Sequence, residues 1–371
     1  MPVTARQIFA RLEEIFPVRL AEDWDNTGLQ LGNPNKSVKK VLVSLDADRE
    51  TVAVGIREDA DLVITHHPLL FNPVKQLDFS QPQAGLLQQL VAKDIAVYSL
   101  HTNLDTAPGG LNQYLAERLG LEDIVPWGTG RFEPLYKLVV YVPRDHVEDV
   151  RRAICAGGAG HIGNYSDCSF RVAGTGTFRP LEGTNPYLGE VGRVAEVEEF
   201  RLETVVPESR VSEVLSSMRK SHPYEEIAYD LIRLSNKGQR LSPARKGRLA
   251  NPVSLAEFAR RVKERLKLGY VSVVGDLQAE IRKVAVVSGS GASFIKRAAH
   301  ENVDVLVTGD VRYHEAREAQ ILGINVVDAG HYGTEHLAVE LLAQVLQEES
   351  ESRQWDVEII RHLSGSPFVS V

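Results

Sequence analysis

The chain has little cysteine, no long apolar run and no excess of positive charge. Its 371 residues include two cysteines, Cys155 and Cys168, which are too few for a disulfide framework and too far apart for a Cys-x-x-Cys site. No apolar stretch is long enough to cross a bilayer, and the N-terminal residues lack the apolar core of a secretory signal. We therefore expect a cytoplasmic protein with reduced thiols and no membrane partner.

The shortage of positive charge argues against nucleic acid as a partner. A formal net charge of -8 provides no general attraction for a phosphate backbone. What is present is the composition of a globular protein, with 43% hydrophobic and 25% charged residues. A chain of this length can bury more than one hydrophobic core, so we expect more than one domain or lobe.

Short apolar strands alternate with amphipathic helices in two stretches of the chain, which is typical of α/β lobes with buried parallel strands. The expected strands are 41–45, 62–64, 95–100, 284–287, 305–307 and 324–327. The two stretches also resemble each other, since Asp61–His66 is similar to Asp304–Gly309. We therefore predict an α/β fold in which two similar lobes, 1–130 and 243–371, form one split domain.

The segment 131–242 between the lobes has a different pattern. Its expected strands are 137–143, 194–198, 200–206 and 228–234, and its expected helices run through Val147 to Ile154 and Val211 to Met218. This pattern predicts a ferredoxin-like α+β domain inserted into the split domain. Turn-rich stretches at 127–130 and 235–238 are the expected joints.

Two turn-forming segments have simple structural interpretations. Residues 24–32 surround the large ring of Trp24 with turn-formers and glycines, and we interpret them as a structural turn with a core tryptophan. Ser288–Gly291 follows a strand and precedes a helix, where phosphate could meet backbone amides. Because it has neither a dinucleotide fingerprint nor a P-loop lysine, we interpret it as a tight strand-to-helix turn.

Histidines and carboxylates follow the strands that the two lobes share. These residues are His66, His67, His101, Asp105, Asp310, His314, His331 and Glu335. Ligands bind beyond the carboxyl ends of parallel strands, so we expect these side chains to converge on one site. Imidazole and carboxylate suit zinc, iron, manganese or nickel, and the lack of cysteine ligands disfavours a structural zinc site.

The adjacent pair His66 and His67 favours a site with two metal ions. Consecutive side chains point in different directions, so one ion does not easily bind both, and carboxylates such as Glu335 can bridge two ions. His331 and Glu335 are four residues apart and share a helix face if the final helix starts early enough, with Thr334 as a candidate N-cap. Taken alone, each residue also has a structural interpretation, such as ending a strand. The convergence from two lobes favours the metal site.

Five motifs carry a family resemblance. They are Trp24–Gly28, Thr65–Pro68, His101–Asp105, Thr308–Asp310 with His314, and Gly330–Glu335. Together they resemble the GTP cyclohydrolase 1 type 2 homologue family, also described as NIF-three-like dinuclear metal-centre proteins. The resemblance implies that two divalent metal ions are bound by His66, His67, Asp105, His331 and Glu335. It leaves His101 and His314 as candidate catalytic acid/base or outer supporting groups.

The resemblance extends to the inserted segment and to assembly. Ser221–Glu226, followed by Ala228–Asp230, matches the PII/CutA-like domain of the longer family members. The family also implies a homohexamer in which the inserted domains form trimeric caps.

Two functions follow from these expectations. The first is a metal-dependent hydrolase of a nucleotide or similar anionic small molecule, in which the metals activate water and His101 or His314 transfers protons. The second is a nonenzymatic metal-handling or regulatory hexameric assembly, in which the inserted domain senses a ligand or controls access to the metals. Both require the same metal site.

Overall fold

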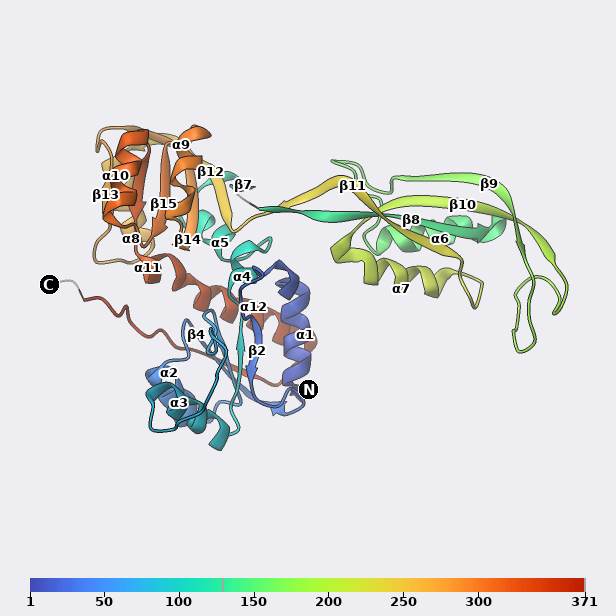
Figure 1. Ribbon diagram of the computed structural model, residues 1–371, viewed down its shortest axis with the longest axis horizontal. Helices are drawn as coiled ribbons and strands as arrows, with labels where there is room; N and C mark the ends of the chain where they lie inside the picture. Colours follow the sequence, from blue (N-terminus) through green and yellow to red (C-terminus); the bar gives the residue numbers. More distant parts are fainter. Residues whose placement is uncertain (129, 370–371) are drawn as a thin grey trace. The chain divides into compact units, whose positions relative to one another are not determined.

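A computed structural model describes residues 1–128 and 130–369, which form two compact units (Figure 1). Unit 1 combines the two chain segments Met1–Gly130 and Leu241–Val371, and unit 2 is Arg131–Arg240. Thr129, within the joint that we expected at 127–130, lies outside the described residues. Both units mix helices and sheets, as the sequence predicted.

The first sheet of unit 1 has five strands in the order β17-β4-β5-β6-β2. Its central strands, all parallel, are β4 (Lys40–Ser44), β5 (Leu62–Thr65) and β6 (Ala96–Ser99), and β2 (Gly28–Leu31) pairs antiparallel with β6. Helix α1 (Ala5–Ile15) packs on one face, and helices α2 (Arg49–Arg57) and α3 (Pro82–Ala92) pack on the other. The strands are buried on both faces, which explains their continuous apolar sequence.

The second sheet of unit 1 has the order β13-β16-β15-β14-β12-β7. Its parallel strands are β14 (Glu280–Ser290), β15 (Val305–Gly309) and β16 (Asn325–Asp328), and the flanking antiparallel strands are β13 (Ser272–Val274), β12 (Ala244–Ser254) and β7 (Glu122–Trp127). Helices α9 (Ile295–His300) and α10 (Tyr313–Leu322) cover one face, and α8 (Leu255–Arg265) covers the other. One hydrophobic cluster runs from the α1 side of the first sheet to the α8 side of the second.

Each sheet of unit 1 contains a strand from the other segment of the chain. Strand β7 comes from the N-terminal segment but pairs with β12 in the second sheet. Strand β17 (Glu358–Arg361) comes from the C-terminal segment but pairs parallel with β4 in the first. Each exchanged strand pairs with backbone groups that would otherwise face solvent at an open edge.

The C-terminal helix α12 (Leu337–Arg353) connects the lobes. It packs on β4 and on α5 (Leu111–Arg118), and Glu340 accepts hydrogen bonds from Tyr114 and Arg118 of α5. In the described part of the chain, α12 and the other helices are too short or too polar to span a membrane.

Unit 2 has the element order β-α-β-β-α-β and a four-stranded sheet, β11-β8-β10-β9. Its elements are β8 (Arg131–Pro143), α6 (Val147–Ala156), β9 (Ser169–Phe178), β10 (Ala195–Pro207), α7 (Val211–Ser221) and β11 (Tyr229–Leu241). Both helices pack on the same face (Figure 1), where Val140, Ile154 and Met218 are buried. This is the connectivity of a ferredoxin-like module. Strand β9 was not predicted, because its residues are mostly exposed and therefore lack an apolar pattern.

Candidate metal centre

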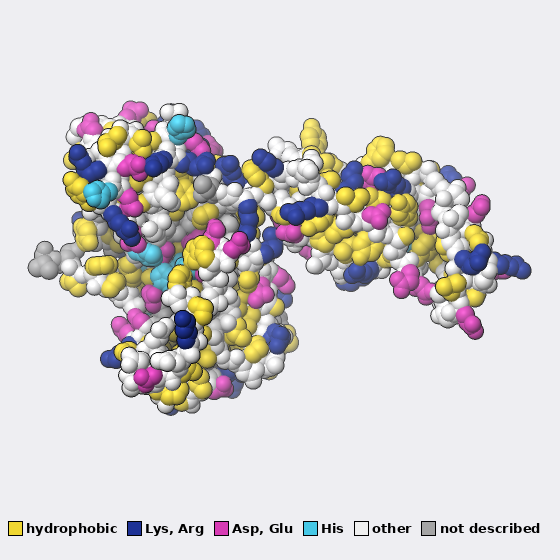
Figure 2. All heavy atoms as spheres, viewed as in Figure 1, with side chains coloured by type: hydrophobic (Ala, Val, Ile, Leu, Met, Phe, Trp, Pro, Cys, Tyr) yellow, Lys and Arg dark blue, Asp and Glu magenta, His cyan; other side chains and the backbone are white. Residues whose placement is uncertain are grey.

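Histidines gather between the two lobes of unit 1, beyond the carboxyl ends of the parallel strands (Figure 2). His66 and His67 directly follow β5, and His101 follows β6 at the start of α4 (Thr102–Thr106). From the other lobe, His331 and Glu335 are the first and last residues of the short helix α11 (His331–Glu335), which follows β16. The strand topology therefore brings together side chains from both ends of the chain.

Glu335 lies at the centre of this cluster. Its Oε2 is 2.9 Å from Nε2 of His67 and 2.9 Å from Nε2 of His331, and its Oε1 is 3.8 Å from Nε2 of His66. Burial raises the pKa of the carboxyl, but the close contacts with His331 and His67 and the charge of the nearby His66 outweigh this effect and hold its pKa well below the usual value. Glu335 is therefore ionised when the protein is folded at neutral pH.

Each of the four clustered histidines binds an oxygen through Nδ1. The pairs are His66 with Leu100 O at 2.8 Å, His67 with Asp46 Oδ1 at 2.7 Å, His101 with Asp25 Oδ1 at 2.8 Å, and His331 with Asp310 Oδ2 at 2.7 Å. Carbonyl and carboxylate oxygens accept hydrogen bonds, so Nδ1 carries the proton in each ring. Nε2 is then the nitrogen that can bind a metal, as in histidine ligands whose other nitrogen is held by a carboxylate or carbonyl.

His66 has a buried ring nitrogen that is left without a partner in the described part of the chain. Its side chain is 0% exposed, and among the described residues its Nε2 makes no hydrogen bond. A buried polar atom without a partner costs about 1–3 kcal/mol. A metal ion bound to this nitrogen would remove that cost, so the residues present fit a divalent metal.

Two sets of three side chains place their ligand atoms within 4.8 Å of one another. One set is His66, His67 and His101, and the other is His67, His331 and Glu335. Each set can hold a metal ion, and His67 belongs to both. His101, which the sequence suggested as an acid/base or supporting group, is thus as close as the candidate ligands.

Asp105 lies beside the cluster but in neither set. Its carboxylate accepts a hydrogen bond from Ser288 Oγ at 2.9 Å. Burial raises the pKa of Asp105 and the charge of Glu335 adds to this effect, while His66 and His101 oppose it. These charge interactions place Asp105 within electrostatic reach of the site.

A buried arginine holds the chain after Asp105. Arg245 is 2% exposed, and its Nη2 donates to the carbonyls of Thr106 at 3.2 Å and Ala107 at 2.8 Å. Burial lowers the pKa of Arg245 to about 10, against the opposing effect of the Asp105 charge. The guanidinium therefore stays charged at neutral pH and fixes the backbone next to a candidate ligand.

The carboxylates that orient the rings were not predicted as such from the sequence. Asp46 follows β4 as His67 follows β5, so the strand-end argument could have identified it. Asp310 was noted at a strand end but was not linked to His331. Asp25 does not follow a predicted strand, and its segment was interpreted as a structural turn, so nothing in the sequence indicated its contact with His101.

Two glycines of the second lobe allow β14 and β15 to pack closely against α11. Gly289 has φ +61°, and a Cβ there would overlap Oε1 of Glu335. A Cβ at Gly309 would overlap the backbone where Gly330 joins His331. The segment Ser288–Gly291, interpreted from sequence as a simple turn, is therefore part of the wall of the site.

Thr334 does not cap the final helix as we suggested. Gly330 precedes α11, and Thr334 Oγ1 donates to the Gly330 carbonyl at 3.1 Å while accepting from Gly289 N at 2.9 Å. The helix thus starts at His331, early enough to put His331 and Glu335 side by side.

Trp24 and His314 lie elsewhere than expected. The prediction of a core tryptophan is wrong, because Trp24 is 62% exposed. The carboxylate of Asp25 binds His101 and the backbone N–H of Thr102, which leaves the preceding Trp24 at the surface. His314 is exposed on α10, where its ring contacts the neighbouring Tyr313, and the structure does not bring it into the cluster.

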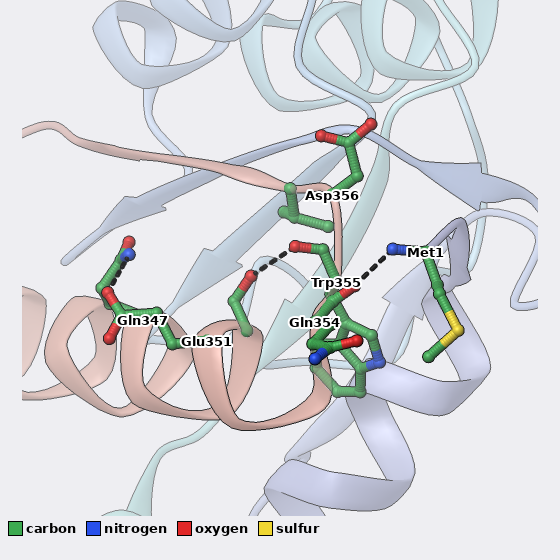
Figure 3. Close-up of a pocket in the computed structure, with 8 residues that line it drawn as sticks. Met1, Gln347, Glu351, Gln354, Trp355 and Asp356 are labelled. Atoms are coloured by element: carbon green, nitrogen blue, oxygen red, sulfur yellow. Dashed lines mark hydrogen bonds between the residues drawn. The ribbon is translucent and has the colours of Figure 1, made fainter.

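A separate hollow of about 380 Å³ lies at the end of α12 (Figure 3). Several of its polar groups bind each other: the Met1 amino group donates to Gln354 O, Ser350 Oγ donates to Trp355 O, and Gln347 binds Glu351. These groups are satisfied within the chain, so the histidine cluster is the better candidate site.

Comparison with known proteins gives consistent matches over the whole chain. The Duf34/NIF3 (NGG1p interacting factor 3) family matches residues 3–364. A Bacillus subtilis (strain 168) protein named GTP cyclohydrolase 1 type 2 homolog is 41% identical over 367 residues, which are 99% of this chain and 98% of the relative. A Halalkalibacterium halodurans protein of the same name is 40% identical over 357 residues, 96% of this chain and 95% of the relative. The crystal structure of a Bacillus cereus protein related to NIF3 matches with a TM-score of 0.91 at 40% identity, covering 100% of this chain and 99% of that one.

Proposed function

Because this chain belongs to the Duf34/NIF3 family, we propose that it is a metal-dependent hydrolase of a nucleotide or similar anionic small molecule, with a dinuclear metal centre. The family assignment confirms the resemblance noted in the motifs, and relatives carry the name GTP cyclohydrolase 1 type 2 homolog. The observation that carries the proposal is the orientation of the rings. All four histidines bind an oxygen through Nδ1, so that Nε2 of each ring faces the interior of the cluster, where Nε2 of His67 and of His331 lie 2.9 Å from Glu335.

The proposed ligands of two divalent ions are His66, His67, Asp105, His331 and Glu335. Support for two ions comes from Glu335, whose two oxygens face different imidazoles, and from His67, which belongs to both sets of close ligand atoms. Zinc, iron, manganese and nickel all suit histidine and carboxylate ligands. When bound, such ions polarise a substrate oxygen and lower the pKa of water.

Within this proposal, His101 transfers the proton. Its Nδ1–H is held by Asp25, a fully buried carboxylate, so Nε2 can accept a proton and the carboxylate stabilises the resulting imidazolium. Burial raises the pKa of Asp25, but hydrogen bonds from His101 and Thr102 outweigh this and keep its pKa below the usual value. We assign this role to His101 rather than to His314 because His314 is exposed on α10.

The test combines elemental analysis with activity on one purified sample. We expect bound divalent metal and turnover of GTP or a related anionic compound. His67→Ala should lose metal and turnover while its far-UV circular dichroism stays unchanged, and His300→Ala, an exposed histidine on α9, should retain both. Metal-replete protein without turnover across a broad nucleotide panel would contradict the hydrolase and favour the nonenzymatic alternative.

We also propose that unit 2 is a PII/CutA-like domain and that the protein is a homohexamer. Support for the first comes from the β-α-β-β-α-β order and sheet order of unit 2. Light scattering coupled to size exclusion would test the second, with a mass of six chains expected.

A further inference from the structure

We propose that Trp24 and Phe71 form a platform that binds the planar ring of a ligand whose anionic end reaches the histidine cluster. This inference rests on the proposed function. The metal ions would recognise the anionic end of the ligand, and the platform would recognise its other end, an aromatic ring of the nucleobase kind.

Both rings are exposed next to the site. Trp24 is 62% exposed and Phe71 is 49% exposed. Their ring centroids are 6.0 Å apart, and each lies close to the ring of His101, at 6.1 Å from Trp24 and 6.3 Å from Phe71. His101 in turn contacts His67 at 5.7 Å. The path from the platform to His67 therefore consists of two ring-to-ring steps of about 6 Å each, the first to His101 and the second from His101 to His67. A ligand of mononucleotide size can span this distance.

The platform is held in place by hydrogen bonds. Asn26 Nδ2 donates to the Leu70 carbonyl at 2.6 Å, and the Leu70 N–H donates to Gln30 Oε1 at 3.2 Å. These bonds join the segment of Trp24 to the segment of Phe71. On the other side, Asp25 binds His101 directly. The two exposed rings are thus positioned before any ligand arrives, which reduces the entropic cost of binding.

An aromatic ring is the ligand group that suits this surface best. Two large apolar rings exposed side by side are unfavourable in water and mark a binding surface. Their edge-to-face arrangement with His101 leaves faces on which a planar ring can stack. Nucleic-acid bases stack on such side chains with little dependence on base identity. The contact with His101 links this surface to the cluster, so a molecule bound at the histidines lies against it.

The experiment compares anions with and without a ring on the metal-loaded, full-length protein. The probes are GTP, ATP and inorganic tripolyphosphate, with affinities measured by calorimetry. We expect the wild type to bind the two nucleotides more tightly than tripolyphosphate. Trp24→Ala and Phe71→Ala should each weaken nucleotide binding about tenfold, since stacking on one side chain contributes on that order, and should leave tripolyphosphate binding unchanged.

Three variants control for folding and for nonspecific effects. Phe79→Ala removes a phenylalanine that is 50% exposed in the same loop but lies outside the platform, and it should leave nucleotide affinity unchanged. Trp24→Phe should restore most of the affinity lost in Trp24→Ala. Of the other two tryptophans, Trp127 is 1% exposed and Trp355 lines the separate hollow at the end of α12, so quenching of tryptophan fluorescence by GTP should be smaller in Trp24→Phe than in the wild type.

Several outcomes would overturn the inference. Equal affinity of the wild type for nucleotides and tripolyphosphate would exclude a ring site while leaving the metal site intact. Loss of nucleotide and tripolyphosphate binding together in Trp24→Ala would mean that this residue supports the cluster. A changed oligomeric mass with unchanged nucleotide preference would assign the platform to a contact between copies. If the metal-loaded wild type binds none of the probes, the proposed function fails, and this inference with it.

Discussion

At the scale of single residues, the cluster is a set of histidines held by carboxylates. Burial lowers the pKa of His67, but hydrogen bonds with Asp46 and Glu335 outweigh it and raise the pKa to about 10. The hydrogen bond with Glu335 raises the pKa of His331 to about 9, with a further contribution from Asp310. In the metal-free protein both imidazoles are therefore protonated at neutral pH, and metal must displace a proton from each Nε2 that it binds.

These shifts predict how the stability of the metal-free protein depends on pH. A folded-state pKa above the unfolded value of about 6.5 means that the protonated rings stabilise the fold. This contribution is fully present below pH 6.5 and is lost as pH rises through 9 to 10. We expect the melting temperature of chelator-treated protein to fall between pH 7 and pH 10. Melting curves by circular dichroism would measure this.

The matched control for this prediction is His67→Gln, which removes one of the rings whose pKa is raised. Its melting temperature should depend less on pH over the same interval. A wild-type melting temperature that stays constant or rises from pH 7 to pH 10 would contradict the charged state assigned to these rings.

At the scale of elements, the site depends on how closely strand ends and short helices approach each other. Strand β14 ends in Ser288–Ser290, which binds Asp105 and lies against Glu335 of α11. Helix α11 starts directly after Gly330, whose φ of +76° turns the chain sharply out of β16. The ends of β14 and β16 and the short helix α11 thus position the candidate ligands. Glycine is required where two of these elements come into contact, as at Gly289.

Gly289→Ala should lower both stability and metal content. The φ of +61° penalises a side chain by roughly 1–2 kcal/mol, and the added Cβ also overlaps Glu335. Gly163→Ala is the matched control, because Gly163 has φ +57° with no heavy atom within 4 Å of an added Cβ. The control should show the backbone cost in a melting experiment but full metal content by elemental analysis. Equal metal content in both variants would contradict the close packing assigned to Glu335.

At the scale of the whole molecule, all candidate ligands and the platform belong to unit 1, although the chain leaves that unit and returns to it. Gly130 and Leu241, where the chain leaves and re-enters, are adjacent, since a Cβ on Gly130 would overlap the Leu241 backbone. Unit 2 has its own hydrophobic core. The two units are therefore separable in their packing, as expected for an inserted domain.

Replacing 131–240 by a short glycine-serine linker should leave metal affinity unchanged. The linker has little distance to span, and the ring partners Asp46, Asp25 and Asp310 all remain. Competition with a chelator would measure the affinity of the deletion variant and of the full chain. A large loss of affinity in a folded deletion variant would show that unit 2 contributes to the site.

Local sequence pattern was sufficient to predict the parallel strands and the histidines that follow them. Buried strands such as β4 and β5 need continuous apolar residues, and a side chain that follows such a strand must lie at the edge of the sheet. These properties depend on neighbours in the chain. His66, His67, His331 and Glu335 could therefore be selected without a structure.

The tertiary structure decided which groups those histidines contact. His67 meets Asp46 and, 268 residues away, Glu335, and His101 meets Asp25. It also decided that β7 and β17 change lobes, that His314 stays outside the cluster and that Trp24 is exposed. Each of these outcomes depends on distances between segments that are far apart in the chain. Residue type and spacing determine the local element, but such distances arise only when the two sheets pack against each other.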